Sequence, residues 1–325
     1  MGKPSVYVTR DIGPEALAVL KKHCNVTMWH EPMNPVPRDE LIKNIAGKDA
    51  LLCLLTDTID VDVLNAAGPY LKIVSTMSVG FDHLDVREMK RRSIKVAHTP
   101  NVSTDSVAEL TVTLLLVTCR RLPEASEAAR NGEWKTWSPF WLCGPSLNNS
   151  TVGIVGFGRI GQQVAQRVKA FNLKSLLYYD QYEKKREAKE LGAELVSLDE
   201  LLTRSDFVIA TCVLIPETAK MFNDEVFQKM KPTAVFINTS RGGVVDQDAL
   251  IRALKTKTIF AAGIDVTVPE PLPTDNELFK LNNCVVLPHV GSATIGARNA
   301  MAMLAVNNVL AALRGERIPA EVVEY

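Results

Sequence analysis

Short runs of β-branched and apolar residues alternate with amphipathic stretches along most of the 325-residue chain. Apolar runs bounded by turn residues predict buried parallel strands, and apolar positions spaced three and four residues apart predict the helices that cover them. The alternation pauses at residue 121 and restarts at residue 151. It predicts an α/β protein with two doubly wound, Rossmann-like parallel sheets. Strands are expected at residues 5–9, 26–29, 50–55, 72–76, 95–98, 151–155, 176–179, 206–211, 233–238, 260–266 and 284–287.

Three stretches depart from this alternation. Residues 104–120 are apolar round most of the helical surface, which predicts a long buried helix. Residues 121–150 combine several prolines and glycines with three tryptophans and predict an irregular arm. The last amphipathic stretch, 293–313, predicts a helix that ends before Gly315.

Composition narrows the class of protein. Lys and Arg total 37, as do Asp and Glu, so we expect no broad basic surface for nucleic acid or an anionic membrane. The six cysteines are scattered singly, which argues against a zinc site or other metal centre and is typical of reduced thiols in a cytoplasmic protein. No apolar run is long enough to span a membrane, and the first residues, MGKPSVYV, lack the apolar core of a signal peptide. We therefore expect a cytoplasmic protein with small-molecule partners.

A glycine-rich turn follows the expected strand at 151–155. The sequence GFGRIG places Gly156, Gly158 and Gly161 between that strand and an amphipathic stretch. In this context the three glycines provide a tight turn, close approach of a pyrophosphate to the backbone, and close packing of helix against strand. Unpaired N–H groups and the helix dipole favour an anion there. The turn therefore predicts a dinucleotide-binding site.

The expected next strand ends at Asp180, where a carboxylate would accept hydrogen bonds from an adenosine ribose. A negative charge at this position should repel a 2′-phosphate, which favours NAD(H) over NADP(H). Lys184, Lys185 and Arg186 follow and could neutralise such a phosphate, or could form a solvated helix face. Both cofactors remain candidates.

Three ionisable residues lie where buried strands are expected to end. Arg241 follows the strand at 233–238, Glu270 follows the strand at 260–266, and His289 follows the strand at 284–287. Ligands bind at the carboxyl ends of strands in open parallel sheets. Each residue alone could be an ordinary surface or turn residue, but together they predict a catalytic site.

Several motifs in this order and spacing resemble the D-2-hydroxyacid dehydrogenases, and the resemblance covers essentially the whole chain. STMSVGFDHLD, CRRLPEA and the WLCG at Trp141 bring it closest to the glyoxylate/hydroxypyruvate reductase branch. The five motifs that identify the family are GFGRIG, CVLIPET, FINTSRGGVVD, GIDVTVPEPLP and LPHVGSAT.

The resemblance implies two α/β domains with an active site in the cleft between them. Residues 1–100 and 288–325 would form a flavodoxin-like substrate-binding domain, and residues 101–287 the dinucleotide-binding Rossmann domain. The 121–150 arm matches the region through which such enzymes form homodimers. Trp141 would either reach the partner's active site or remain an interface or core residue.

The resemblance also implies a role for each candidate site residue in the reduction of a 2-oxo acid. Arg241 would bind the carboxylate and polarise the carbonyl, and the backbone N–H groups of Ser78, Val79 and Gly80 would cradle the carboxylate. His289 would donate the proton to the nascent alkoxide, with Glu270 orienting its ring. The residues expected around NAD(H) or NADP(H) are Thr104, Gly156, Gly158, Arg159, Ile160, Gly161, Asp180, Val213, Pro216, Thr239, Asp265 and Ser292.

The expected reactions are glyoxylate to glycolate and hydroxypyruvate to D-glycerate. Asp180 favours NAD(H), whereas the branch favours NADP(H). One alternative is a dinucleotide-sensing scaffold, as in the transcriptional corepressors that share the fold. Another is a different 2-hydroxyacid dehydrogenase of the family. Of these, phosphoglycerate dehydrogenase usually carries additional regulatory domains, and formate dehydrogenase needs further polar residues around its substrate.

Overall fold

The protein, for which a computed structural model describes residues 2–322, divides into two compact units. One unit comprises residues 2–103 and 293–322, and the other comprises residues 104–292. Residues 101–103, expected in the dinucleotide-binding domain, belong to the first unit. Residues 288–292, expected in the substrate-binding domain, belong to the second. The second shift has a clear cause, because the backbone N–H groups of His289, Val290 and Gly291 all donate to Asp265 of the second unit.

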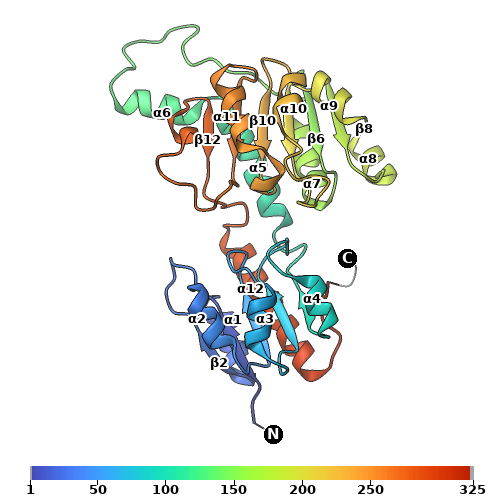
Figure 1. Ribbon diagram of the computed structural model, residues 1–325. Helices are drawn as coiled ribbons and strands as arrows, with labels where there is room; N and C mark the ends of the chain where they lie inside the picture. Colours follow the sequence, from blue (N-terminus) through green and yellow to red (C-terminus); the bar gives the residue numbers. More distant parts are fainter. Residues whose placement is uncertain (1, 323–325) are drawn as a thin grey trace. The chain divides into compact units, whose positions relative to one another are not determined.

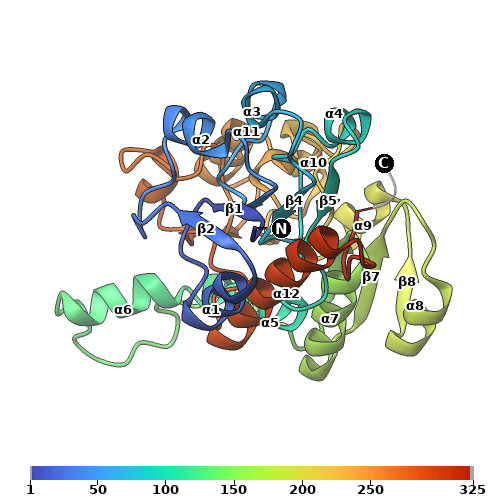
Figure 2. The ribbon, with the colours of Figure 1, turned by 90° about the horizontal axis from the view of Figure 1, so that it is seen from below.

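The first unit is built on a five-stranded parallel sheet in the order β2-β1-β3-β4-β5. Alternate residues of β1 point to opposite faces, so Val6 and Val8 pack in one apolar cluster and Tyr7 in the other. Helices α1 and α12 cover the first face and lie side by side, while α2, α3 and α4 cover the second (Figure 2). The elements are β1 Ser5–Val8, α1 Pro14–His23, β2 Asn25–Met28, α2 Arg38–Ile45, β3 Ala50–Cys53, α3 Val61–Ala67, β4 Ile73–Thr76, α4 Val86–Arg91, β5 Lys95–Ala97 and α12 Ile295–Arg314.

The second unit contains a seven-stranded parallel sheet in the order β12-β11-β10-β9-β6-β7-β8 (Figure 1). The chain enters at β6, proceeds outward to β8 and returns to β9 on the other side of β6, which places the topological switch point between β6 and β9. Both sheets confirm the predicted fold class. The elements are α5 Thr104–Cys119, α6 Leu122–Arg130, β6 Thr151–Val155, α7 Arg159–Val168, η1 Lys169–Phe171, β7 Ser175–Tyr179, α8 Lys185–Leu191, β8 Ala193–Leu195, α9 Leu198–Arg204, β9 Phe207–Ala210, α10 Asp224–Lys229, β10 Val235–Asn238, η2 Gly242–Val244, α11 Gln247–Lys255, β11 Ala261–Ile264, η3 Glu277–Lys280 and β12 Cys284–Val286.

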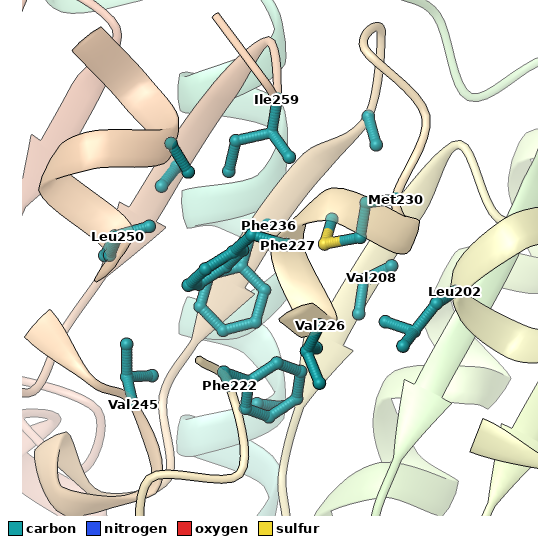
Figure 3. Close-up of a cluster of buried hydrophobic side chains, with 14 of the residues drawn as sticks. Leu202, Val208, Phe222, Val226, Phe227, Met230, Phe236, Val245, Leu250 and Ile259 are labelled. Atoms are coloured by element: carbon teal, nitrogen blue, oxygen red, sulfur yellow. The ribbon is translucent and has the colours of Figure 1, made fainter. Parts of the chain in front are cut away.

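An aromatic cluster packs against β10, the strand that leads to Arg241 (Figure 3). The ring centroids of Phe222 and Phe236 are 4.7 Å apart, and Phe227 meets Phe236 edge-on at 5.4 Å. All three rings are fully buried. Side chains of this size contribute several kcal/mol each through burial and packing, so the cluster fixes the strand from which the Arg241 loop extends.

The expectation of an irregular arm at residues 121–150 was partly wrong. Its first part forms helix α6, while residues 131–150 contain no helix or strand. Pro123 lies in the first turn of α6, where its missing N–H removes no helical hydrogen bond. The Arg121 guanidinium also binds the Glu124 carboxylate in that turn, at 2.7 Å.

Candidate active site

The glycine-rich turn connects β6 to α7 in the geometry that a bound anion requires. Gly156 has φ +92°, and a Cβ there would lie 2.6 Å from the Cys212 Cα atom. A Cβ on Gly161 would collide with the Gly156 carbonyl, whereas one on Gly158 would meet no atom within 4 Å. Gly158 is also the N-cap residue of α7 and offers no side chain to the first-turn N–H groups. The turn therefore has both the space and the N–H donors to bind a dinucleotide pyrophosphate.

The Asp180 carboxylate, at the end of β7, is already engaged by the backbone. Its Oδ2 accepts a 2.7 Å hydrogen bond from the N–H of Phe157, inside the glycine-rich turn. Its Oδ1 accepts from the N–H of Tyr182 at 3.0 Å. Asp180 thus ties the glycine-rich turn to the end of the neighbouring strand, and its expected contact with a ribose stays a prediction.

The three basic residues after Asp180 differ in their partners. Lys185 pairs with Glu183 at 3.4 Å and Arg186 with Glu190 at 3.1 Å, both on the exposed surface. The ammonium of Lys184 lies 5.8 Å from the centre of the Tyr182 ring. Of these three basic residues, Lys184 has no acidic partner among residues 2–322.

Asn238, at the end of β10, shapes the loop that carries Arg241. Its fully buried amide accepts hydrogen bonds from the N–H and hydroxyl of Ser240 and donates to the carbonyl of Arg241 at 2.9 Å. A Cβ on Gly242 would collide with the Thr267 carbonyl, so the Arg241 loop lies directly against the loop after β11. Arg241 itself is half-buried.

Asp265, at the end of β11, holds the segment that carries His289. Its two carboxylate oxygens accept from the N–H groups of Val290 and Gly291, each at 2.8 Å, and its carbonyl accepts from the His289 N–H at 2.9 Å. Burial raises the pKa of Asp265, and the two N–H groups and the nearby imidazole oppose that rise. The side chain is 1% exposed, so it acts within the protein as a fixed acceptor.

His289 and Glu270 form a hydrogen-bonded pair. The His289 Nδ1 atom lies 2.8 Å from Glu270 Oε2, and Glu270 Oε1 accepts from the Thr267 N–H at 2.9 Å. Burial alone would raise the pKa of Glu270, but the His289 hydrogen bond and charge, the Thr267 N–H and the Arg241 charge together lower it below its usual 4.5. Glu270 therefore stays ionised and fixes one nitrogen of the ring, which leaves Nε2 to face a reacting group.

The other expected cofactor residues lie in or beside these loops. Thr239 donates to or accepts from the Thr111 hydroxyl at 2.7 Å. Val213 and Pro216 are exposed in the loop after β9. Thr104 begins α5 and Ser292 is the last residue of the second unit, both half-buried.

Ser78, Val79 and Gly80 follow β4 in the first unit. The Ser78 hydroxyl donates to the Gly80 carbonyl at 2.6 Å, which closes the turn on itself. Ser78 is buried, while Val79 and Gly80 are half-buried.

Some site residues were not identified from the sequence. Gln247 clamps the Glu270 loop through its amide, which donates to the Val268 carbonyl and accepts from the Val268 N–H. Thr218 closes the loop after β9 by donating to the Val213 carbonyl at 2.6 Å. Neither residue type marks such a role in a sequence. Asn238 is different, because a polar amide at the end of a buried strand is a sequence signal for a side chain that shapes the next loop.

Within residues 2–322, no helix is long and apolar enough to cross a membrane, and no cluster of three or more His, Cys, Asp or Glu side chains could hold a metal ion. All six cysteines are free thiols. The side chains and backbone groups described above can bind and orient an organic anion and move a proton.

Known proteins are similar to this chain in sequence and in fold. A human glyoxylate reductase/hydroxypyruvate reductase is 53% identical over 318 residues, which is 97% of each chain. A crystal structure of a Thermus thermophilus protein has a TM-score of 0.91 and 41% identity over 98% of this chain and 100% of that one. An NADPH-dependent glyoxylate/hydroxypyruvate reductase from Sinorhizobium meliloti has a TM-score of 0.86 and 32% identity over 99% of this chain and 97% of that one.

The sequence model of the D-isomer specific 2-hydroxyacid dehydrogenase NAD binding domain matches residues 112–291. This range includes the glycine-rich turn and the loops of Arg241, Glu270 and His289. Together with the full-length similarity, the match shows that this chain belongs to the D-isomer specific 2-hydroxyacid dehydrogenase family.

Proposed function

We propose that this protein reduces small 2-oxo acids, glyoxylate and hydroxypyruvate, with a reduced nicotinamide dinucleotide. The observation that carries the proposal is the His289–Glu270 pair in the same unit as a turn that fits a pyrophosphate. The names of the human and Sinorhizobium relatives support the two substrates. A dinucleotide-sensing scaffold has no observation in its favour.

His289 serves as the acid of this reaction. When bound, the reduced nicotinamide supplies the hydride. As negative charge develops on the carbonyl oxygen of the substrate, that oxygen takes the proton from Nε2 of His289. Glu270 accepts from Nδ1 throughout, so it fixes the ring orientation and stabilises the imidazolium with its charge. Asp265 holds the backbone from which the imidazole projects.

Arg241 and the turn after β4 bind the substrate acid. The planar guanidinium of Arg241 can donate to a carboxylate and to the adjacent carbonyl oxygen at once, which a lysine ammonium cannot reproduce. The N–H groups of Val79 and Gly80 are likewise suited to donate to a carboxylate. These contacts orient the 2-oxo acid and polarise its carbonyl.

The cofactor is a nicotinamide dinucleotide, and the choice between NADH and NADPH depends on the residues after β7. The Asp180 charge opposes a 2′-phosphate, whereas Lys184 could bind one, since its ammonium has no acidic partner among the described residues. The family model is described as NAD binding, and the Sinorhizobium relative as NADPH-dependent. We propose that Asp180 sets the preference towards NADH.

We also propose that the enzyme is a cytoplasmic homodimer formed through the 121–150 arm. Trp134, Trp137 and Phe140 expose 66%, 80% and 86% of their surface, which is unusual for three large aromatic residues within seven positions. Trp141 is 41% exposed and either reaches the partner's active site or packs in the interface. The free thiols fit a reducing compartment.

Replacement of His289 tests the proposed acid. The wild-type protein should oxidise NADH or NADPH when given glyoxylate or hydroxypyruvate, and His289→Gln should lower kcat roughly 10²- to 10⁴-fold with a smaller change in KM. His23→Gln, on the exposed end of α1, is the matched control and should leave both constants unchanged. A near-normal kcat in His289→Gln would contradict the proposal that His289 is the acid. A wild-type protein that binds cofactor but shows no turnover would favour the dinucleotide-sensing scaffold.

Replacement of Glu270 should change the pH dependence. The lowered pKa of Glu270 keeps its carboxylate ionised at any pH above its usual 4.5, so a negative charge lies beside His289 over that range. Glu270→Gln keeps a hydrogen-bond acceptor but removes the charge that favours the imidazolium. The falling limb of the pH–rate profile for reduction should therefore move to lower pH. A limb that stays in place would show that Glu270 does not act on His289 through its charge.

Replacement of Asp180 tests the cofactor preference. Asp180→Asn removes the charge but keeps an oxygen for the Phe157 N–H, whereas Asp180→Ala removes both. Both variants should raise kcat/KM for NADPH relative to NADH, by on the order of tenfold for a repulsion of about 1.4 kcal/mol. Asp180→Ala should also weaken both cofactors, because the glycine-rich turn loses its anchor. An unchanged ratio in both variants would contradict charge control by Asp180.

A further inference from the structure

Two successive peptide carbonyls after β4 are held by residues that follow β5. The Ser78 carbonyl accepts from the Thr99 N–H at 2.8 Å, and the Val79 carbonyl lies 2.8 Å from His98 Nδ1. A carbonyl can only accept, so Nδ1 of His98 carries the proton in this contact. The two bonds anchor both carbonyls on the same neighbouring segment.

This anchoring determines where the next two N–H groups point. In a planar trans peptide the carbonyl and the following N–H point in opposite directions. The N–H groups of Val79 and Gly80 are therefore directed away from residues 98 and 99. Neither group donates to an atom of residues 2–322, and both residues are half-buried. Successive unpaired N–H groups of this kind form an anion-binding concavity.

His98 is itself rigidly held. Its N–H donates to the Ala320 carbonyl at 3.2 Å, and its carbonyl accepts from the Asn308 amide of α12 at 2.9 Å. Asn308 is fully buried and also accepts from the Ala320 N–H at 3.0 Å. The Phe81 ring meets the imidazole edge-on, with centroids 5.5 Å apart. The imidazole is thus fixed by the backbone at β5, by α12 and by an aromatic neighbour.

A second set of contacts involves the residues at the start of the turn. The hydroxyls of Thr76 and Ser78 are 2.7 Å apart, and Nε2 of His83 lies 3.0 Å from the Thr76 hydroxyl. These bonds hold the start of the turn. His98 is the side chain that holds the Val79–Gly80 peptide.

We propose that His98 is a positioning residue for the substrate carboxylate. By donating from Nδ1 to the Val79 carbonyl, it aims the Gly80 N–H at the anion without touching the anion itself. The inference rests on the proposed function, since it names a residue that sets the affinity for the same 2-oxo acids. It assigns His98 to substrate binding and not to proton transfer.

The test compares His98→Leu with His98→Asn. The asparagine amide can place a donor near the position of Nδ1, whereas leucine cannot donate. His98→Leu should raise KM for glyoxylate and Kd for the dicarboxylate probe oxalate by about 5- to 30-fold, the range for one lost hydrogen bond, with kcat within about threefold of wild type. His98→Asn should stay within about threefold of wild type in all constants. His23→Leu, on the exposed end of α1, controls for loss of a histidine.

A folded His98→Leu protein with KM and oxalate Kd within twofold of wild type would overturn the proposal, as would equal losses in His98→Asn and His98→Leu. Oxalate binding is measured by calorimetry and does not need turnover. If wild type failed to reduce glyoxylate, the proposed function would fail while oxalate binding still decided the role of His98. If neither variant folded, ¹⁵N-histidine NMR of wild type would decide, because a His98 ring protonated only at Nε2 would contradict the bond to Val79.

Discussion

The buried carboxylate of Asp265 is the constraint on which the candidate active site depends. It accepts two N–H groups from residues 290 and 291, and its carbonyl accepts a third from His289, so one residue at the end of β11 fixes the whole segment after β12. Burial of this acid raises its pKa, and the two N–H donors offset part of that rise. His289 is held with φ +55°, and its imidazole meets Glu270. Without this anchor the ring would have no fixed direction.

The parallel sheet explains why residues distant in sequence can act on one reaction. Strands β6, β10, β11 and β12 all run in the same direction, so the loops after them share one edge of the sheet. The switch point between β6 and β9 opens that edge next to the glycine-rich turn. The aromatic cluster around Phe236 and the buried amide of Asn238 then keep the Arg241 loop in place. The candidate catalytic residues thus lie on loops, and the strands that precede these loops hold them in place.

Much of this arrangement could be predicted from the sequence, because apolar runs and glycine turns are local signals. Several expected strands ran one or two residues beyond the observed ends, as at 50–55 against Ala50–Cys53, because the apolar pattern continues through Leu54 and Leu55 after the last ladder bond. Helix α6 was not expected, because Pro123 resembles a helix breaker wherever it lies. The bonds from Asp265 to residues 290 and 291, and from His98 to Val79, could not be predicted, since nothing local in either segment identifies a partner 19 to 26 residues away.

The central claim is hydride transfer to C2 of a 2-oxo acid with His289 as the acid. The most direct measurement follows deuterium from dihydronicotinamide labelled at C4 on either face, in both NADH and NADPH, with glyoxylate and hydroxypyruvate as acceptors. The account predicts that label from one face appears at C2 of glycolate and glycerate, that glycerate is the D isomer, and that His289→Gln slows label transfer without redirecting it. Cofactor oxidation with no label at C2 from either face, or L-glycerate as product, would contradict the account.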